Sequence, residues 1–239
     1  MADWSPIALS VLHRKQLALG AVMVQADGWQ HAARFTTPED ETERVREGVG
    51  LCDVSPSGKL YLLGDETGSA LGQAFPGLGK MSSGGVSVQP SAAADPGEQV
   101  VLARLADDEV LVVTPPGRAP TVSEAMATPL SGCVHVVNVT SALAAVSIAG
   151  PLVHRLLTVL TELDVSADAF PDLSCAQTMI AEVHGTLLRR DIGAMPRFDL
   201  LFGREYGEYM WDALFEAGPV VPFGIEALKG LTTENTEIR

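Results

Sequence analysis

The sequence has few cysteines, and their spacing gives no motif. Its 239 residues include only Cys52, Cys133 and Cys175, with no CxxC pair and no histidine at metal-ligand spacing. An odd count of scattered cysteines argues against a disulfide framework and is typical of reduced thiols. We therefore expect a cytoplasmic protein without a structural metal site.

Basic side chains are also scarce. The chain has 16 lysines and arginines against 30 aspartates and glutamates, which gives a formal net charge of −14. The acidic residues are spread along the sequence, and such a surface repels phosphate backbones. Nucleic acid is therefore excluded as a partner, and the acidity is interpreted as a solubility feature.

Long apolar runs are absent. No stretch approaches the roughly 20 apolar residues of a membrane helix. The opening residues MADWSPIALSVLHRKQ are interrupted too early by polar side chains to form a signal peptide. With 46% hydrophobic and 19% charged residues, the composition predicts a globular protein that does not act at a membrane. We expect one domain over residues 1–239, which could divide into two lobes.

Helices and strands alternate in the predicted order. Capping residues and apolar spacing predict helices over 5–20, 65–75, 150–163, 204–218 and 222–231. A further helix is predicted to begin at residue 37 and to end at Gly48 or Gly50. Strands are predicted within 21–29, 58–65, 135–150, 175–190 and 197–203, with a three-stranded meander over 82–117. The order predicts an α+β protein with mostly antiparallel sheets.

Three segments resemble the aminomethyltransferase family, which includes the T-protein of the glycine cleavage system. They are LHRKQLALGAVMVQADGWQ, VREGVGLCDVSPSGKLYLLGD and RFDLLFGREYGEYMWDALFEAGPVVPFGIEAL, in the family's order. Within this resemblance, the segment LDVSADAFPDLSCAQTMIAEVHGTLLRRD is similar to the gamma subunit of heterotetrameric sarcosine oxidase. The resemblance implies a T-protein-like folate-binding fold without the family's C-terminal barrel domain.

The family's chemistry implies a tetrahydrofolate cofactor and two carboxylates. A one-carbon unit passes between an amine and the folate, and a carboxylate near the reacting edge stabilises positive charge. That catalytic position matches Glu98, in PGEQVVLARL, and the position that anchors the pterin matches Asp199, in RFDLL. Asp199 is one methylene shorter than the family's glutamate. The sequence also departs at Ile192, where the family has a tyrosine, and at Leu228 and Thr232, where it has arginines.

The polar stretch from Val45 to Glu66 is predicted to be a structural turn beside a pocket. Asp53 and Ser55 are expected to cap the turn through hydrogen bonds to the backbone. Cys52 is expected to be a small core residue, since no histidine lies near enough in sequence to activate a thiol or hydroxyl.

Two functions remain open from the sequence. One is tetrahydrofolate-dependent one-carbon transfer or demethylation with altered site residues, Glu98 and Asp199, acting on a small amine. The other is a non-catalytic, gamma-like subunit that packs on flavoprotein subunits of an amine oxidase or demethylase complex. A third branch of the family, the folate-binding iron–sulfur maintenance proteins, is disfavoured because LKGLTTENTE lacks that branch's cysteine.

Overall fold

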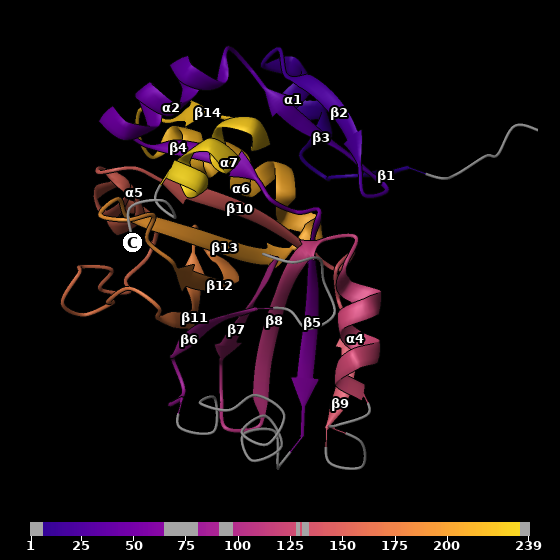
Figure 1. The fold of residues 1–239 in the computed structure, drawn as a ribbon. Helices are drawn as coiled ribbons and strands as arrows, with labels where there is room; N and C mark the ends of the chain where they lie inside the picture. The colour runs from indigo at the N-terminus through magenta and orange to yellow at the C-terminus, as the bar shows by residue number, and fades with distance from the viewer. Residues whose placement is uncertain (1–6, 65–80, 91–97, 128–129, 131–133, 235–239) are drawn as a thin grey trace, which may run out of the picture.

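The computed structural model describes residues 7–64, 81–90, 98–127, 130 and 134–234. Three β-sheets form the framework, and the helices pack around them (Figure 1). The helices are α1 (His13–Ala18), α2 (Pro38–Glu47), α4 (Ala119–Ala127), α5 (Val153–Leu160), α6 (Gly207–Glu216) and α7 (Ile225–Glu234), with a 3-10 turn, η2, over Arg204–Tyr206.

The largest sheet has six strands in the order β11-β12-β13-β10-β4-β14. Its members are β11 (Cys175–Ile180), β12 (Val183–Arg189), β13 (Arg197–Gly203), β10 (Leu143–Ala149), β4 (Gly50–Asp53) and β14 (Val221–Pro222). All neighbours are antiparallel except β14, which pairs in parallel with β4. Early and late parts of the chain therefore meet in one sheet.

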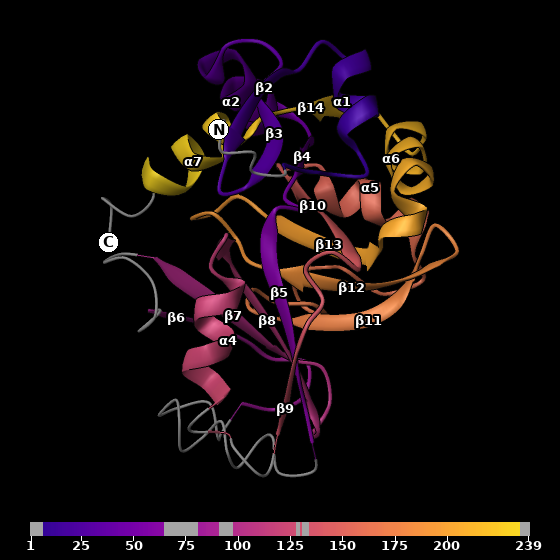
Figure 2. The same cartoon turned by 90° about the vertical axis from the view of Figure 1, so that its right-hand side faces the viewer.

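A five-stranded sheet lies next to the first, in the order β6-β7-β8-β5-β9. Its strands are β6 (Val86–Pro90), β7 (Gln99–Arg104), β8 (Glu109–Pro116), β5 (Ser57–Leu63) and β9 (His135–Asn138). The predicted meander is confirmed, since β6, β7 and β8 pair in sequence order. Helix α4 covers one face of this sheet, and the other face shares an apolar core with the six-stranded sheet (Figure 2).

Local signals explain helix α2 fully. Thr37 accepts a hydrogen bond from the backbone N–H of Asp40, Pro38 begins the helix, and Gly48 ends it. Acidic side chains in the first turn and arginines in the last turn complement the helix dipole. The predicted helix is confirmed, and Gly48 is the one of the two expected glycines that ends it.

The helix predicted over 5–20 is wrong at its beginning. Residues 8 and 9 form β1 (Ala8–Leu9), which pairs in parallel with β3 (Trp29–Arg34), and the helix begins only at His13. Strands β2 (Val22–Ala26) and β3 form a hairpin through Asp27 and Gly28, both at positive φ. The edge of that hairpin offers the backbone of residues 8 and 9 hydrogen bonds that outweigh helix propensity. The helix predicted over 65–75 lies outside the described residues.

The strand region predicted over 175–190 contains two strands rather than one. Strands β11 and β12 form a hairpin whose turn places Ala181 and Glu182 at φ 47° and 62°. Neither residue is the glycine or asparagine that usually signals such a turn, so this turn was not predictable from the local sequence.

Among the described residues, no helix is both long enough and apolar enough to cross a lipid bilayer.

Candidate functional site

Strand β13 presents two chemically different faces. Phe198, Leu200 and Phe202 join the core beneath α5 and α6. Successive side chains of a strand point to opposite faces, so Arg197, Asp199 and Leu201 share the other face. That face is directed toward the five-stranded sheet, where Leu201 packs in the core that the two sheets share.

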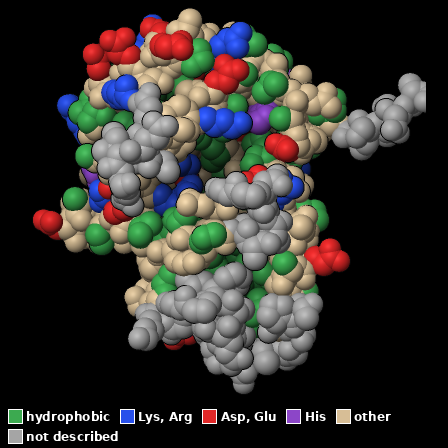
Figure 3. Space-filling model, viewed as in Figure 1, with side chains coloured by type: hydrophobic (Ala, Val, Ile, Leu, Met, Phe, Trp, Pro, Cys, Tyr) green, Lys and Arg blue, Asp and Glu red, His purple; other side chains and the backbone are tan. Residues whose placement is uncertain are grey.

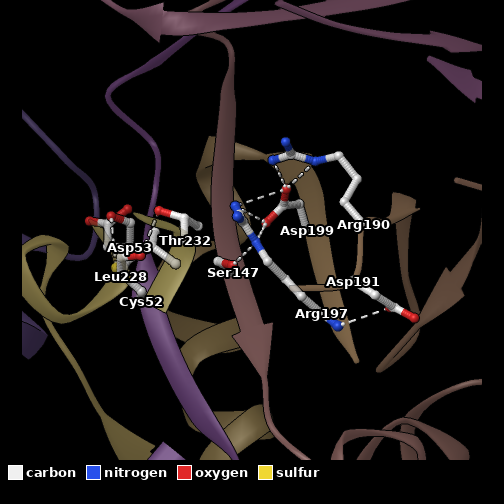
Figure 4. A network of polar contacts seen from close by, with 9 residues as sticks. All are labelled: Cys52, Asp53, Ser147, Arg190, Asp191, Arg197, Asp199, Leu228 and Thr232. Carbon is white, nitrogen blue, oxygen red and sulfur yellow. Dashed lines mark hydrogen bonds and ion pairs between the residues drawn. The ribbon is translucent and has the colours of Figure 1, made fainter. Parts of the chain in front are cut away.

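The carboxylate of Asp199 is bound by two arginines (Figure 4). Arg197 Nη2 donates to Asp199 Oδ1 at 2.9 Å, and Arg190 Nε donates to Oδ2 at 3.1 Å. Arg190 makes a second contact with the carboxylate, and Arg197 makes two more. Arg197 Nε also donates to Ser147 Oγ at 2.8 Å. Ser147 lies on β10 at the position directly opposite Asp199. The aspartate is thus the centre of a buried charge network.

This network keeps Asp199 ionised. Burial by itself raises the pKa of the carboxyl, but the charges of Arg197 and Arg190 and their hydrogen bonds hold the pKa of Asp199 well below its usual range. Burial lowers the pKa of Arg197, and the Asp199 charge opposes that shift. The carboxylate is therefore a permanent anion whose acceptor positions are largely occupied.

Asp199 lines a small cavity between the two sheets. The cavity measures about 30 Å³. Its lining combines one acid, three cations and small or apolar residues: Asp199, Lys59, Arg190, Arg197, Val54, Ser57, Val113, Ala145 and Leu201. Ligand pockets for drug-sized molecules are roughly 300–1,000 Å³. Figure 3 shows the molecular face hollowed between its upper and lower parts, with basic side chains beside the hollow.

Lys59 is the most buried cation of this cavity, with 0% exposure. Its Nζ donates to the carbonyl oxygens of Ser55 at 2.7 Å and Ser57 at 2.9 Å. Burial lowers the pKa of Lys59 to about 8, although the negative charge of Asp53 opposes the shift. The ammonium group is therefore held by carbonyl oxygens of the segment just before Lys59 in the chain.

The turn predicted around Cys52 lies after it, between β4 and β5, and Cys52 itself belongs to strand β4. Asp53 Oδ1 accepts the backbone N–H of Ser55 at 2.9 Å, and Ser55 Oγ bridges to both backbone groups of Ala145. Cys52 is buried in the core, and burial raises the pKa of its thiol. A protonated, buried thiol is a packing residue rather than a nucleophile.

Glu98 belongs to a different cluster of side chains from Asp199. It forms an ion pair with Arg118 at 3.0 Å, and it is not among the residues that line the cavity. Pro90 pairs with Gln99 across β6 and β7, so Glu98 stands just before strand β7. The structure therefore does not bring the two sequence-predicted carboxylates together at this cavity.

The positions that depart from the family pattern take structural roles. Ile192 and Leu228 are buried in the shared core, and Thr232 Oγ1 donates to the Leu228 carbonyl within α7. Figure 4 shows Leu228 and Thr232 to one side of the arginine network. The described part of the chain contains no group of three or more His, Cys, Asp or Glu placed to hold a metal ion.

Sequence reasoning missed the three cations of the cavity. One signal was available for Arg197: the spacing Arg-x-Asp in RFDLL places Arg197 and Asp199 on one face of a strand. No local pattern indicates Lys59 or Arg190, because Arg190 reaches Asp199 through the pairing of β12 with β13 and Lys59 lies on β5 of the other sheet.

Comparison with protein families gives a match over nearly the whole chain. The model of the GCVT N-terminal domain matches residues 12–238. The chain belongs to this family. The resemblance seen in the sequence is thereby confirmed.

Curated relatives of this GCVT-family chain are longer than it is. It is 27% identical over 223 residues to an aminomethyltransferase of Geobacillus sp. (strain WCH70), covering 91% of this chain and 61% of the relative. It is 26% identical over 264 residues to the sarcosine oxidase subunit alpha of Rhizobium meliloti (strain 1021), covering 98% of this chain and 26% of the relative. The chain thus spans less than two thirds of each.

Solved structures support the same fold. The glycine cleavage system aminomethyltransferase T from Bartonella henselae superimposes with a TM-score of 0.82 at 16% identity, over 95% of this chain and 62% of that one. A chain of heterotetrameric sarcosine oxidase from Corynebacterium sp. U-96 superimposes with a TM-score of 0.62 at 18% identity, over 87% and 93%. The predicted α+β, T-protein-like fold of mostly antiparallel sheets is confirmed.

Proposed function

We propose that this GCVT-family chain is a non-catalytic subunit that packs on flavoprotein subunits of a heteromeric amine oxidase or demethylase. A cytoplasmic location is part of the proposal, in keeping with the free, buried thiols of Cys52 and Cys175. The relatives include a sarcosine oxidase subunit, and one structural neighbour comes from a heterotetramer.

The occupied carboxylate of Asp199 carries this proposal. A pterin anchor needs free acceptor positions on the carboxylate, and here two guanidinium groups fill them. The adjoining cavity of about 30 Å³ is far smaller than the roughly 300–1,000 Å³ of pockets that hold drug-sized ligands. Glu98, the other expected carboxylate, is engaged with Arg118 outside the cavity.

Exposed apolar side chains near the N-terminus favour a protein partner. Six large ones occur on and beside β1, α1 and β2: Ile7, Leu9, Leu17, Leu19, Val22 and Val24. Each is between 39% and 49% exposed. A partner subunit that packs on this segment would bury part of this apolar surface.

Purification of the tagged chain from its native host tests the proposal. We expect a flavoprotein to co-purify, detected by flavin absorbance and mass spectrometry. Val24→Lys is expected to reduce the recovered flavin about tenfold or more, as a charge buried in an interface does. Val159→Lys is the matched control, since Val159 is an exposed valine on α5. Recovery of the chain without any flavoprotein would contradict the proposal.

Tetrahydrofolate-dependent one-carbon transfer is the second candidate. It is favoured by one observation: Asp199 lines a cavity at the position that the family resemblance assigns to the pterin anchor. Arg190, with 22% side-chain exposure, is the arginine best placed to move aside. Isothermal titration with tetrahydrofolate separates the candidates. Heat at micromolar ligand that disappears in Asp199→Ala supports transfer, whereas absence of heat supports the subunit.

A further inference from the structure

The cavity beside Asp199 has more positive than negative charge. Lys59, Arg190 and Arg197 line it, and Asp199 is the one acid among the described residues that line it. The charge of Asp53 offsets part of the charge of Lys59, although its oxygens accept hydrogen bonds from Gln16 and Ser55 and not from Lys59. Buried cations in excess are costly unless an anion pairs with them.

Several N–H donors of these cations have no acceptor within the part of the chain that the structure describes. An ammonium has three donors, and Lys59 uses two of them on Ser55 and Ser57. Arg190 and Arg197 direct Nε and Nη2 to Asp199, which leaves the Nη1 groups of both without a protein acceptor among the described residues. These donors belong to three side chains around one cavity.

We propose that this cavity binds one small monovalent carboxylate of the size of formate. The planar guanidinium edges of Arg190 and Arg197 match a carboxylate, and Lys59 supplies a third donor from the opposite sheet. A volume of about 30 Å³ excludes amino acids and rings. The bound anion neutralises part of the excess charge and ties the two sheets together.

Thermal unfolding of the isolated chain tests this site without any partner protein. If formate does not bind, the proposed subunit function is unaffected. If no flavoprotein co-purifies, the proposed formate site is likewise unaffected. Sodium formate is added in increasing concentration, and sodium gluconate keeps the ionic strength constant. Gluconate alone is the control, since its anion is too large for the cavity. We expect a saturable rise in Tm of about 3–6 °C at ten times Kd.

Two cavity variants and one matched control make the test specific. Lys59→Met and Arg190→Gln are each expected to weaken formate binding about tenfold or more. Arg104→Gln should respond as the wild type does, because Arg104 pairs with Asp107 at 3.2 Å and does not line the cavity. Arg190 is partly exposed, so we expect Arg190→Gln to fold. That variant alone can test the site if Lys59→Met does not fold.

Three results would overturn the proposal. The first is a formate response no larger than that of gluconate. The second is an equal formate response in the wild type and both cavity variants. The third is a chloride response as large as that of formate, which would show a site for charge alone and not for a carboxylate.

Discussion

The side chain of Asp199 is both buried and paired with two arginines. Its side chain is 7% exposed, and both of its arginine partners are at most 22% exposed. A buried ion pair adds little stability in itself, but removing one partner leaves a charge without compensation. The network is therefore far more sensitive to neutralisation than an exposed pair.

Asp199→Asn is expected to destabilise the protein by about 3–5 kcal/mol, because Arg197 and Arg190 would remain buried without a counter-charge. Urea unfolding followed by circular dichroism measures the change. Glu98→Gln is the control, and its loss should stay below about 1 kcal/mol since the Glu98–Arg118 pair is partly exposed. Equal effects of the two substitutions would contradict this account.

The lowered pKa of Lys59 predicts that the stability of the protein depends on pH in the alkaline range. Its pKa is about 8 in the fold and 10.5 in the unfolded chain, so the unfolded chain binds more protons between these values. Stability from this group therefore rises as pH increases from about 8 toward 10.5.

Comparison with Lys59→Met isolates this effect in formate-free buffer. Relative to the variant, the wild type should gain on the order of 3 kcal/mol across that pH range, since each pKa unit corresponds to about 1.4 kcal/mol. A difference between the two proteins that stays constant with pH would show that Lys59 does not titrate as described.

At the level of elements, the sequence predicted what local chemistry determines. Thr37, Pro38 and Gly48 delimit α2 through contacts within a few residues, so that helix was predictable. Residues 8 and 9 became a strand through pairing with β3, a contact about twenty residues away in sequence. The family resemblance located Asp199, and Arg197 lies on the same strand. Arg190 reaches Asp199 through the pairing of β12 with β13, and Lys59 reaches the cavity through the packing of two sheets, and no local pattern encodes either contact.

Gly150 fixes the connection between β10 and α5. Its φ is +130°, and a Cβ there would lie 2.2 Å from the carbonyl oxygen of Gly48 at the end of α2. Gly150→Ala is therefore expected to lower stability by about 2–4 kcal/mol in thermal unfolding. Gly230→Ala in α7 is the control, because a Cβ there meets nothing within 4 Å. It should stabilise the chain by about 0.5–1 kcal/mol.

At the scale of the whole molecule, Glu41 connects distant parts of the chain. Its side chain is 1% exposed, and its two oxygens accept the backbone N–H groups of Phe35, Thr36 and Gly224. One carboxylate thus links the segment before α2 to the segment before α7.

Glu41→Gln is expected to cost about 1–3 kcal/mol, since an amide offers only one acceptor oxygen for these N–H groups. Hydrogen exchange should quicken at Gly224 in the variant. Glu39→Gln, on an exposed part of the same helix, should change neither quantity. Unchanged exchange at Gly224 in Glu41→Gln would show that this link is unimportant.

The parallel pairing of Val221 with Gly50 has a consequence for biosynthesis. A ribosome releases strand β4 long before it releases either neighbour, β10 or β14. The nascent chain must therefore hold apolar residues such as Leu51 unburied until its last segments emerge. Such late closure slows folding, so chaperone assistance during translation should raise the yield of native protein.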